Sequence, residues 1–407
     1  MPCVRLYPLF AIVLLVTATG AASTCVVQER VIPASAVVKV DSGGNLYALD
    51  WSGSGWGPLR KFDSSGLPVW VQPGPAAPLP QPPRPCCRST LAVDRSGNVY
   101  VTVDSISEIV TVKHDAQGVR LWEARTIGDR DETMGSGDLM AIDDESGAVY
   151  VIGGRVLTQE QKTVIINERE EIITIKYGAI ITIKYGPDGR QEWAAQYGSA
   201  WGASANAIAI GPHGSVAVAG CLGYNCVVLK YDAQGALLWE QPGPSSWFVR
   251  IDAGGAVYAG GSGPVRKYDA SGSLLWSGLP SGYGIDGMEV DGAGNVYVLA
   301  GQGRTSKYGP SGELLWSVGG GASGLCALAL DGVGNVYVSA PDTSGAIVTV
   351  KYDANGAQMW RVSYEEGGGH VCPYAGAGGV AVDERGNVYV QTHCAGGLIK
   401  YAQPGGP

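Results

Sequence analysis

The stretch ALALDGVGNVYVSA (residues 327–340), followed by VTVKYDANGAQMW (residues 348–360), contains the two phrases from which this chain is built. The second phrase runs Lys, an aromatic residue or His, four turn residues ending in Gly, three more residues and Trp. Seven complete copies begin at Lys61, Lys113, Lys184, Lys230, Lys267, Lys307 and Lys351. An eighth copy begins at Lys400 and reaches Gly405 without a following Trp.

The first phrase precedes each copy of the second. It is an alternating apolar run, a short turn with Gly, and a second alternating run. Its eight copies are centred on Asn45, Asn98, Ala148, Ser215, Ala256, Asn295, Asn335 and Asn387, at spacings from 39 to 67 residues. Strict alternation indicates half-buried strands, and the Gly-containing turns indicate hairpins. Repeats of this period are typical of propeller blades and related arrays.

Each repeat therefore predicts four antiparallel strands, A to D, which make one blade. The prediction is an all-β chain: a single β-propeller of eight four-stranded blades, with seven blades as the alternative. The last repeat lacks strand D, and we expect CVVQERVI (residues 25–32) to supply it and close the ring. The recurring Trp is expected to pack between blades; a recurring ligand platform is the alternative.

Both phrases resemble the bacterial SBBP-type β-propeller repeats, in which GNVYV-like and KYDASGSLLW-like strings alternate. The resemblance covers nearly the whole chain after residue 22, and it implies a fold without implying catalytic residues. The GNVYV phrase also resembles NHL repeats. The Gly-to-Trp phrase is similar to the tryptophan-docking motif of quinoprotein propellers, although its Asp-to-Gly spacing is one residue shorter.

The first 22 residues have the pattern of a secretory signal peptide, with Arg5, an apolar run and a small-residue cleavage site. We expect the propeller at 23–403 and a short tail at 404–407. Cys25 raises a lipoprotein alternative. The apolar run is short for a membrane span. With a net charge of −9 and no basic stripe, nucleic acid is not an expected partner. The predicted location is secreted, periplasmic or extracellular, in a bacterium.

One segment departs from the repeat. A charged insertion at 155–171 precedes IITIKYG, which occurs at 172–178 and again at 180–186. We expect one copy to form strand C of the third blade and the other to lengthen the preceding loop. An eight-residue shift keeps the side-chain faces in phase.

Long connections between strands B and C and between D and A are expected on one rim, where binding residues of rigid scaffolds gather. The aromatic and His candidates that fall in these connections are Trp51, Trp56, Trp201, Trp247, His370 and His393. Aromatic platforms of this kind suit sugar rings or a protein partner. Local burial of the Trp side chains is the alternative.

Eight Cys follow residue 22, an even number that fits an oxidising compartment. Cys221 and Cys226 flank LGYN and are expected to pin one hairpin, and Cys372 and Cys394 are expected to pair. A zinc site formed by His370, Cys372, His393 and Cys394 is the alternative. Cys86 and Cys87 are adjacent disulfide candidates that look like the vicinal pair of pyrroloquinoline-quinone alcohol dehydrogenases. One connection contains a cluster of acidic residues that could bind calcium, and a solvated acidic loop is the alternative. The residues are Asp129, Asp131, Glu132 and Asp138.

The function that these features predict is a secreted binding or interaction module for an extracellular glycan or protein, without a cofactor and without enzymatic activity. An extracellular quinone- or metal-dependent enzyme is the alternative, and a structural unit of the cell envelope is a third hypothesis. The sequence does not specify the oligomeric state.

Overall fold

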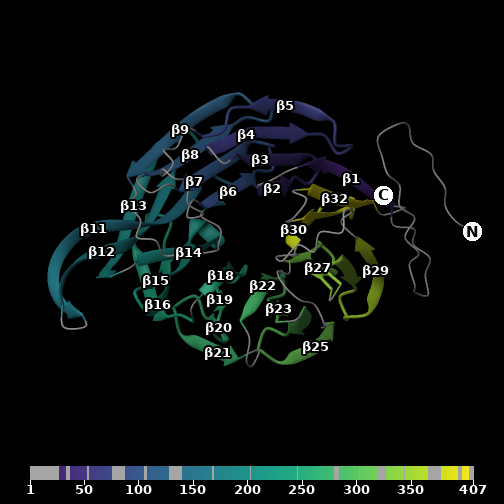
Figure 1. Cartoon of the computed structure of the whole chain (residues 1–407). Helices are drawn as coiled ribbons and strands as arrows, with labels where there is room; N and C mark the ends of the chain where they lie inside the picture. The colour runs from purple at the N-terminus through teal and green to yellow at the C-terminus, as the bar shows by residue number, and fades with distance from the viewer. Residues whose placement is uncertain are drawn as a thin grey trace, which may run out of the picture. The chain divides into compact units, whose positions relative to one another are not determined.

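The computed structural model describes residues 27–33, 37–52, 55–75, 88–104, 108–127, 140–166, 169–201, 203–244, 246–278, 284–301, 303–319, 327–342, 344–364, 377–392 and 397–402. These residues form eight four-stranded antiparallel sheets, the blades of a β-propeller (Figure 1). The helical structure within them is the single 3-10 turn η1 (Pro212–Gly214). The predicted all-β class and the eight four-stranded blades are therefore confirmed. The predicted leader (1–22), Cys25 and the tail (404–407) lie outside the described residues.

One compact unit consists of Met1–Trp51, Gly57–Gly74 and Tyr283–Pro407. Blade one comprises β2 (Val37–Val40), β3 (Leu46–Ser52), β4 (Gly55–Phe62) and β5 (Pro68–Gln72). Blade six comprises β22 (Ile285–Val290), β23 (Val296–Ala300), β24 (Arg304–Tyr308) and β25 (Leu314–Gly319). Blade seven comprises β26 (Ala327–Leu330), β27 (Val336–Pro341), β28 (Ile347–Tyr352) and β29 (Gln358–Tyr364). Blade eight comprises β30 (Ala377–Val382), β31 (Val388–Thr392), β32 (Gly397–Ala402) and β1 (Val27–Pro33).

The other unit consists of Ser52–Trp56 and Pro75–Gly282. Blade two comprises β6 (Arg88–Val93), β7 (Val99–Asp104), β8 (Glu108–His114) and β9 (Arg120–Ile127). Blade three comprises β10 (Met140–Ile142), β11 (Val149–Ile166), β12 (Arg169–Tyr185) and β13 (Gln191–Trp201). Blade four comprises β14 (Ala203–Ile210), β15 (Val216–Leu222), β16 (Asn225–Tyr231) and β17 (Leu237–Pro242). Blade five comprises β18 (Ser246–Ile251), β19 (Val257–Gly261), β20 (Val265–Tyr268) and β21 (Leu274–Gly278).

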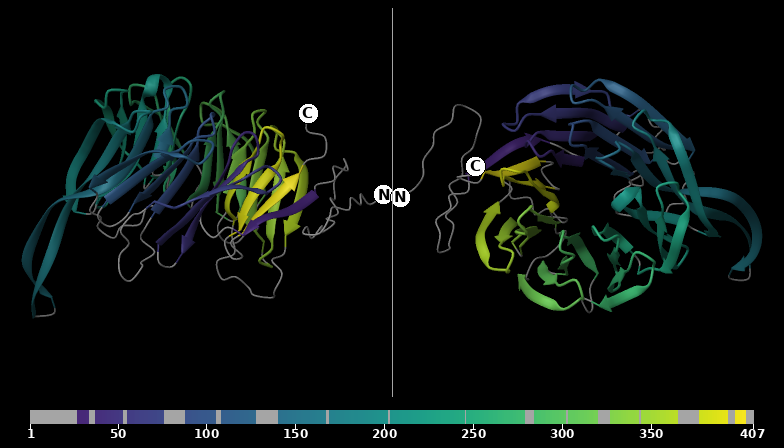
Figure 2. Two further views of the ribbon diagram at one scale, coloured as in Figure 1. Left: turned by 90° about the horizontal axis from the view of Figure 1, so that it is seen from above. Right: turned by 180° about the vertical axis from the view of Figure 1, so that it is seen from behind.

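Strand β1 completes blade eight. It pairs antiparallel with β32 in a register that runs from Val27 opposite Ala402 to Pro33 opposite Gly397. Figure 2 shows the two strands, purple and yellow, side by side in both views. The expected role of the N-terminal segment as strand D of the last blade is confirmed.

The first phrase builds a turn around a carboxylate. In blade seven, Asp331 Oδ1 accepts a hydrogen bond from the Asn335 backbone N–H at 2.8 Å. Asp331 Oδ2 accepts from Asn335 Nδ2 at 2.7 Å and from the Tyr337 hydroxyl at 3.0 Å. Tyr337 is fully buried. The Asp therefore satisfies a polar group that burial would otherwise leave unpaired.

The second phrase joins neighbouring blades within a unit. The Trp193 indole N–H donates to the Ala233 carbonyl of blade four at 2.9 Å. Its ring lies against Gly235, which has φ +85°, so that a Cβ there would come within 2.6 Å of the ring. Trp122, Trp239 and Trp316 donate to the corresponding carbonyls of Pro187, Ala270 and Ala354 at 3.0–3.1 Å. The expectation that the repeated Trp packs between blades is confirmed for these four.

The duplicated segment forms strand rather than loop. Both IITIKYG copies lie in β12, which pairs with β11 from Tyr185 opposite Val149 to Arg169 opposite Ile166. The second copy enters the core, where Ile180, Ile181 and Tyr185 are buried. Figure 1 shows the β11–β12 hairpin, in teal, extending past the other strands of its sheet. The predicted loop was wrong because alternating β-branched residues continue the pairing beyond the blade.

Candidate functional site

The four candidate Trp residues do not lie in loops. Trp51 and Trp56 belong to strands β3 and β4, Trp201 is the last residue of β13, and Trp247 is the second residue of β18. The prediction of loop positions was wrong, because the strands continue past the repeat phrases into the variable connections. Trp247 is exposed over 37% of its surface.

Several other candidates lie outside the described residues. The first set is His370, His393, Cys372, Cys394, Cys86 and Cys87. The acidic candidates Asp129, Asp131, Glu132 and Asp138 do so as well. The pairing of Cys372 with Cys394, the zinc alternative, the role of the vicinal pair and the calcium hypothesis therefore stay predictions.

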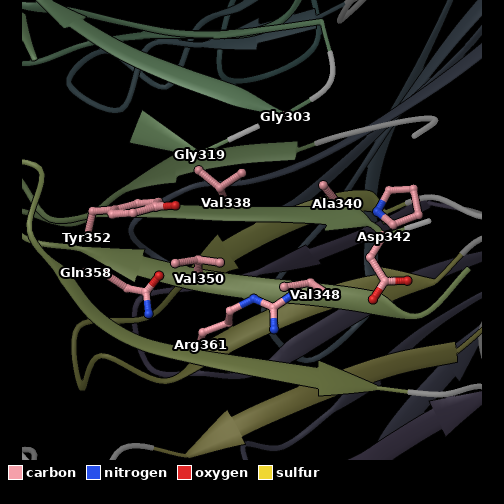
Figure 3. A pocket seen from close by; sticks show the side chains of 11 residues that line it. Gly303, Gly319, Val338, Ala340, Asp342, Val348, Val350, Tyr352, Gln358 and Arg361 are labelled. Carbon is pink, nitrogen blue, oxygen red and sulfur yellow. The ribbon is translucent and has the colours of Figure 1, made fainter. Parts of the chain in front are cut away.

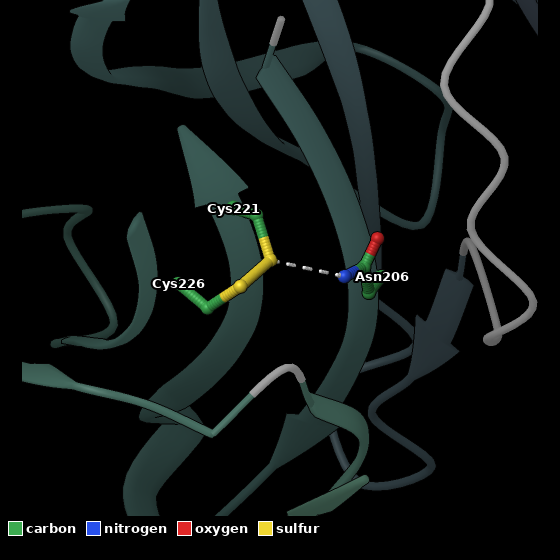
Figure 4. Close-up of a disulfide and its surroundings, with 3 residues drawn as sticks. All are labelled: Asn206, Cys221 and Cys226. Atoms are coloured by element: carbon green, nitrogen blue, oxygen red, sulfur yellow. Dashed lines mark hydrogen bonds between the residues drawn. A yellow bond between two sulfur atoms is a disulfide. The ribbon is translucent and has the colours of Figure 1, made fainter. Parts of the chain in front are cut away.

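The predicted Cys221–Cys226 disulfide is present. The two Cys residues lie directly opposite each other at the end of the β15–β16 hairpin, where Leu222 pairs with Asn225. Asn206 of β14 donates its side-chain N–H to Cys221 Sγ at 3.8 Å (Figure 4). The hairpin tip, with Tyr224 exposed over 92% of its surface, is thus held from two sides.

A cleft of about 400 Å³ lies beside this hairpin, between blades three and four. We call it the hairpin cleft. Its polar lining consists of Tyr197 from β13, Tyr224 and Asn225 from the hairpin, and Glu240 and Gln241 from β17. Val227 and Pro242 add apolar surface. The volume lies in the range of small-molecule sites, and the lining is more polar than is usual for them.

The wall of the hairpin cleft is fixed by hydrogen bonds to its backbone carbonyl groups. The Gly243 N–H donates to the Cys226 carbonyl at 2.8 Å. The Pro242 carbonyl accepts from the Tyr268 hydroxyl at 2.8 Å and from Arg266 Nη1 at 2.6 Å. Blade five therefore holds the segment that lines the cleft in blade four. A site held in this way loses little conformational entropy when a ligand binds.

Glu240 and Tyr197 form the polar centre of the hairpin cleft. Burial and a hydrogen bond to the Glu240 carboxylate raise the pKa of Tyr197 to about 12. The phenol therefore remains protonated at neutral pH, and the Glu240 side chain is exposed to solvent. A carboxylate, a phenol and two amides offer both donors and acceptors to a ligand rich in hydroxyl groups.

Glu240 and Tyr197 are not among the residues that the repeat pattern predicted to be functional. Glu240 directly follows the docking residue Trp239, a position that holds Val71, Ala194, Ser277 and Ser317 in four other blades but the charged residues Glu123 and Arg361 in two more. Alignment of the repeats would therefore have shown a variable position without singling out Glu240. Tyr197 carries no distinct signal either, because it is one more aromatic residue in an alternating strand.

Within the described part of the chain, none of the helical structure has the length and apolar character needed to cross a membrane.

A family model described as outer membrane protein assembly factor BamB, PQQ_2, matches residues 224–353, from the tip of the blade-four hairpin to β28. Among curated proteins, none is significantly similar in sequence to this chain.

Three solved structures are similar over nearly their whole length. BamB from Moraxella catarrhalis is 14% identical with a TM-score of 0.53, covering 96% of this chain and 98% of that one. The C-terminal WD40 domain of Sif2 is 11% identical with a TM-score of 0.57, covering 97% of each chain. The computationally designed protein Ika8 is 12% identical with a TM-score of 0.58, covering 95% of this chain and 99% of that one. At these identities the similarity establishes the β-propeller fold of this chain.

Proposed function

We propose that this chain is an extracytoplasmic binding module that holds a glycan in the hairpin cleft. The proposal rests on the lining of the hairpin cleft. Two Tyr side chains, Tyr197 and Tyr224, line it together with the Glu240 carboxylate and the amides of Asn225 and Gln241. A tyrosine ring offers a flat apolar face and a polar tip. Sugar rings present apolar C–H faces and hydroxyl edges, and this lining is complementary to both.

Two observations support a location outside the cytoplasm. The Cys221–Cys226 bond is of a kind that persists in oxidising compartments. The family model that matches residues 224–353 is described as an outer membrane protein assembly factor, which favours the cell envelope of a bacterium. We likewise retain the SBBP type of repeat as a proposal, supported by the two alternating phrases.

We further propose that the chain binds its ligand without transforming it. Glycoside hydrolysis usually requires two carboxyl groups flanking the bond, whereas Glu240 is the one carboxylate among the described residues that line the hairpin cleft. Intact mass measured under native and then denaturing conditions tests the enzyme alternative. Non-protein mass lost on denaturation would favour a quinone- or metal-dependent enzyme.

A glycan array, followed by titration of the best ligand, tests the binding proposal. We expect Tyr224→Ala and Glu240→Gln to weaken binding about tenfold each, since each removes a stacking face or a charged hydrogen-bond acceptor. Glu384→Gln, which changes an exposed glutamate in the β30–β31 turn, is the matched control. Binding that survives both cleft substitutions would place the ligand elsewhere, and an empty array would redirect the search to a protein partner.

A further inference from the structure

A second cavity, of about 240 Å³, lies between blades six and seven in the other unit. We call it the arginine cleft. Figure 3 shows its floor, formed by Val338 of β27 and by Val348 and Val350 of β28. The Arg361 side chain extends along β28 toward Val348 and Asp342 in the same view. The floor is apolar and its rim is charged.

Two glycines of blade six leave the space open. Gly303 and Gly319 stand where the wall of the arginine cleft faces blade seven. Gly319 has φ +77°, and a Cβ there would lie 2.9 Å from the Gly303 carbonyl oxygen and 3.4 Å from the Tyr352 hydroxyl. The backbone therefore requires Gly at this position, and the cavity follows from that requirement.

Arg361 is placed over this floor by the sheet register. It directly follows Trp360, the Trp of the second phrase in blade seven, and lies opposite Val350, which in turn lies opposite Val338. These three residues make one row across blade seven. The guanidinium lies in the same cavity as the Val side chains of the floor.

Among the described residues, Arg361 forms no hydrogen bond or ion pair. Its charge acts on Asp342 and Tyr352 without such a contact. The contrast with blade two is direct, because Glu123 at the same repeat position bonds Arg120 and Arg125 at 2.7–2.8 Å. A guanidinium is a rigid fork of donors that matches a carboxylate in a bidentate contact.

We propose that the arginine cleft binds a single carboxylate carried on a short aliphatic group. Arg361 would hold the carboxylate, the Val row would receive the aliphatic group, and the Gln358 amide lies within the same lining. Hydrogen bonds from Ser344, with a smaller contribution from Arg361, lower the pKa of Asp342. A negative charge at the rim therefore disfavours ligands with a second anionic group.

This chemistry has two sources: a free aliphatic acid, or the C-terminal residue of a polypeptide. Calorimetric titration of the full chain with butyrate, N-acetyl-Gly-Val and the C-terminal amide of N-acetyl-Gly-Val separates them. Binding of both acids indicates a small-molecule ligand, and binding of the peptide acid alone indicates a polypeptide C-terminus. We expect no binding of the amide, because it lacks the charge that pairs with Arg361.

Variants of the cleft locate the binding. Arg361→Gln should weaken the acid at least about tenfold, the loss typical of a charged hydrogen bond. Val350→Leu should also weaken it, since the larger side chain fills the floor while the charge is retained. Arg385→Gln, in the β30–β31 turn, is the matched control, and melting curves verify that each variant is folded. Failure of both acids to bind the native chain, or equal binding by folded Arg361→Gln, would overturn the proposal.

Discussion

Gly235 illustrates how two demands meet at one residue of the repeat. Its φ of +85° is a conformation that residues with a Cβ rarely adopt, and the Trp193 ring occupies the space that a Cβ would need. The same pair of demands recurs at Gly189, Gly272 and Gly356, which lie against Trp122, Trp239 and Trp316. The last Gly of the phrase is therefore a turn residue and a docking surface at once.

Gly235→Ala should destabilise the fold by about 2–4 kcal/mol, the sum of a left-handed conformation and an overpacked contact. The control is Gly345→Ala, since Gly345 has φ +87° but no atom within 4 Å of its Cβ position. Urea unfolding of both variants measures the difference. Equal losses would mean that the Trp contact contributes little.

His114 occupies a position where other blades carry a phenyl or phenol ring, such as Phe62 and Tyr352. It is buried, and its Nδ1 has no hydrogen-bond partner among the described residues. Burial lowers the pKa of His114, and the charge of Arg120 lowers it further, while Asp115 acts in the opposite direction. The ring is therefore harder to protonate in the folded chain than in the unfolded one.

The sign of the pH effect follows from this shift. Above the unfolded pKa of about 6.5, His114 is neutral in both the folded and the unfolded chain. Below it, the unfolded chain binds the proton more readily, so the free energy of unfolding decreases as the pH is lowered. His114→Phe should flatten the loss between pH 7.5 and 5 by up to about 1.4 kcal/mol per pH unit. Urea unfolding at the two pH values measures it. An unchanged pH dependence in the variant would show that His114 is not responsible.

At the scale of elements, strands β11 and β12 are longer than the four-stranded part of their blade. The second IITIKYG copy supplies the buried residues Ile180, Ile181 and Tyr185. Residues 172–176 of the first copy pair with β11, and the pairing of β12 with β13 begins only at Tyr177. Apolar β-branched strands with free edges also favour aggregation.

Deleting residues 156–163 together with 172–178 removes seven paired positions and the bulge residue Leu157, and leaves Arg155 opposite Ala179 and Val164 opposite Glu171. We expect the melting temperature to change by only about 2 °C and light scattering after heating to decrease, because the copy in the core is retained. A large fall in the melting temperature would show that the projecting half of the hairpin supports the blade.

The two phrases were sufficient to predict the turns and four strands of seven blades, because both signals are local and repeated. The fourth strand of blade eight was predicted from the separate segment at residues 25–32. The variable connections were not predictable in the same way. Trp51, Trp56 and Trp201 lie in strands that extend by pairing with a neighbour, and pairing partners are not encoded in the local pattern. The two clefts were missed for a related reason. Tyr197 and Glu240 come from different blades. The arginine cleft is open because Gly303 and Gly319 have no side chains to fill it.

At the scale of the whole molecule, blade eight depends on the most distant pairing in the chain. Ile399 and Tyr401 of β32 are part of the core shared with blade seven, and β1 covers the outer edge of that strand. Removal of β1 exposes an unpaired edge and loses six paired positions at once.

Deleting residues 23–33 should lower the melting temperature by about 10 °C or more, as the loss of several kcal/mol implies for a domain of this size. The control is the double substitution Glu29→Ala/Arg30→Ala, which keeps the backbone pairing. A synthetic peptide of residues 23–33 added to the truncated protein should restore part of the loss. An unchanged melting curve on truncation would contradict a structural role for β1.

The pairing of Val27 with Ala402 also orders events during synthesis. The ribosome delivers β1 first and its partner β32 last, so β1 waits unpaired while every other blade is made. Pairing between the two ends is slow to form because the intervening chain must first be brought together. For as long as translation continues, the unpaired β1 and the incomplete last blade are open to wrong partners. Slow synthesis of the last blade therefore lengthens the time in which β1 is unpaired and in which a chaperone that binds unfolded chains would reduce aggregation most.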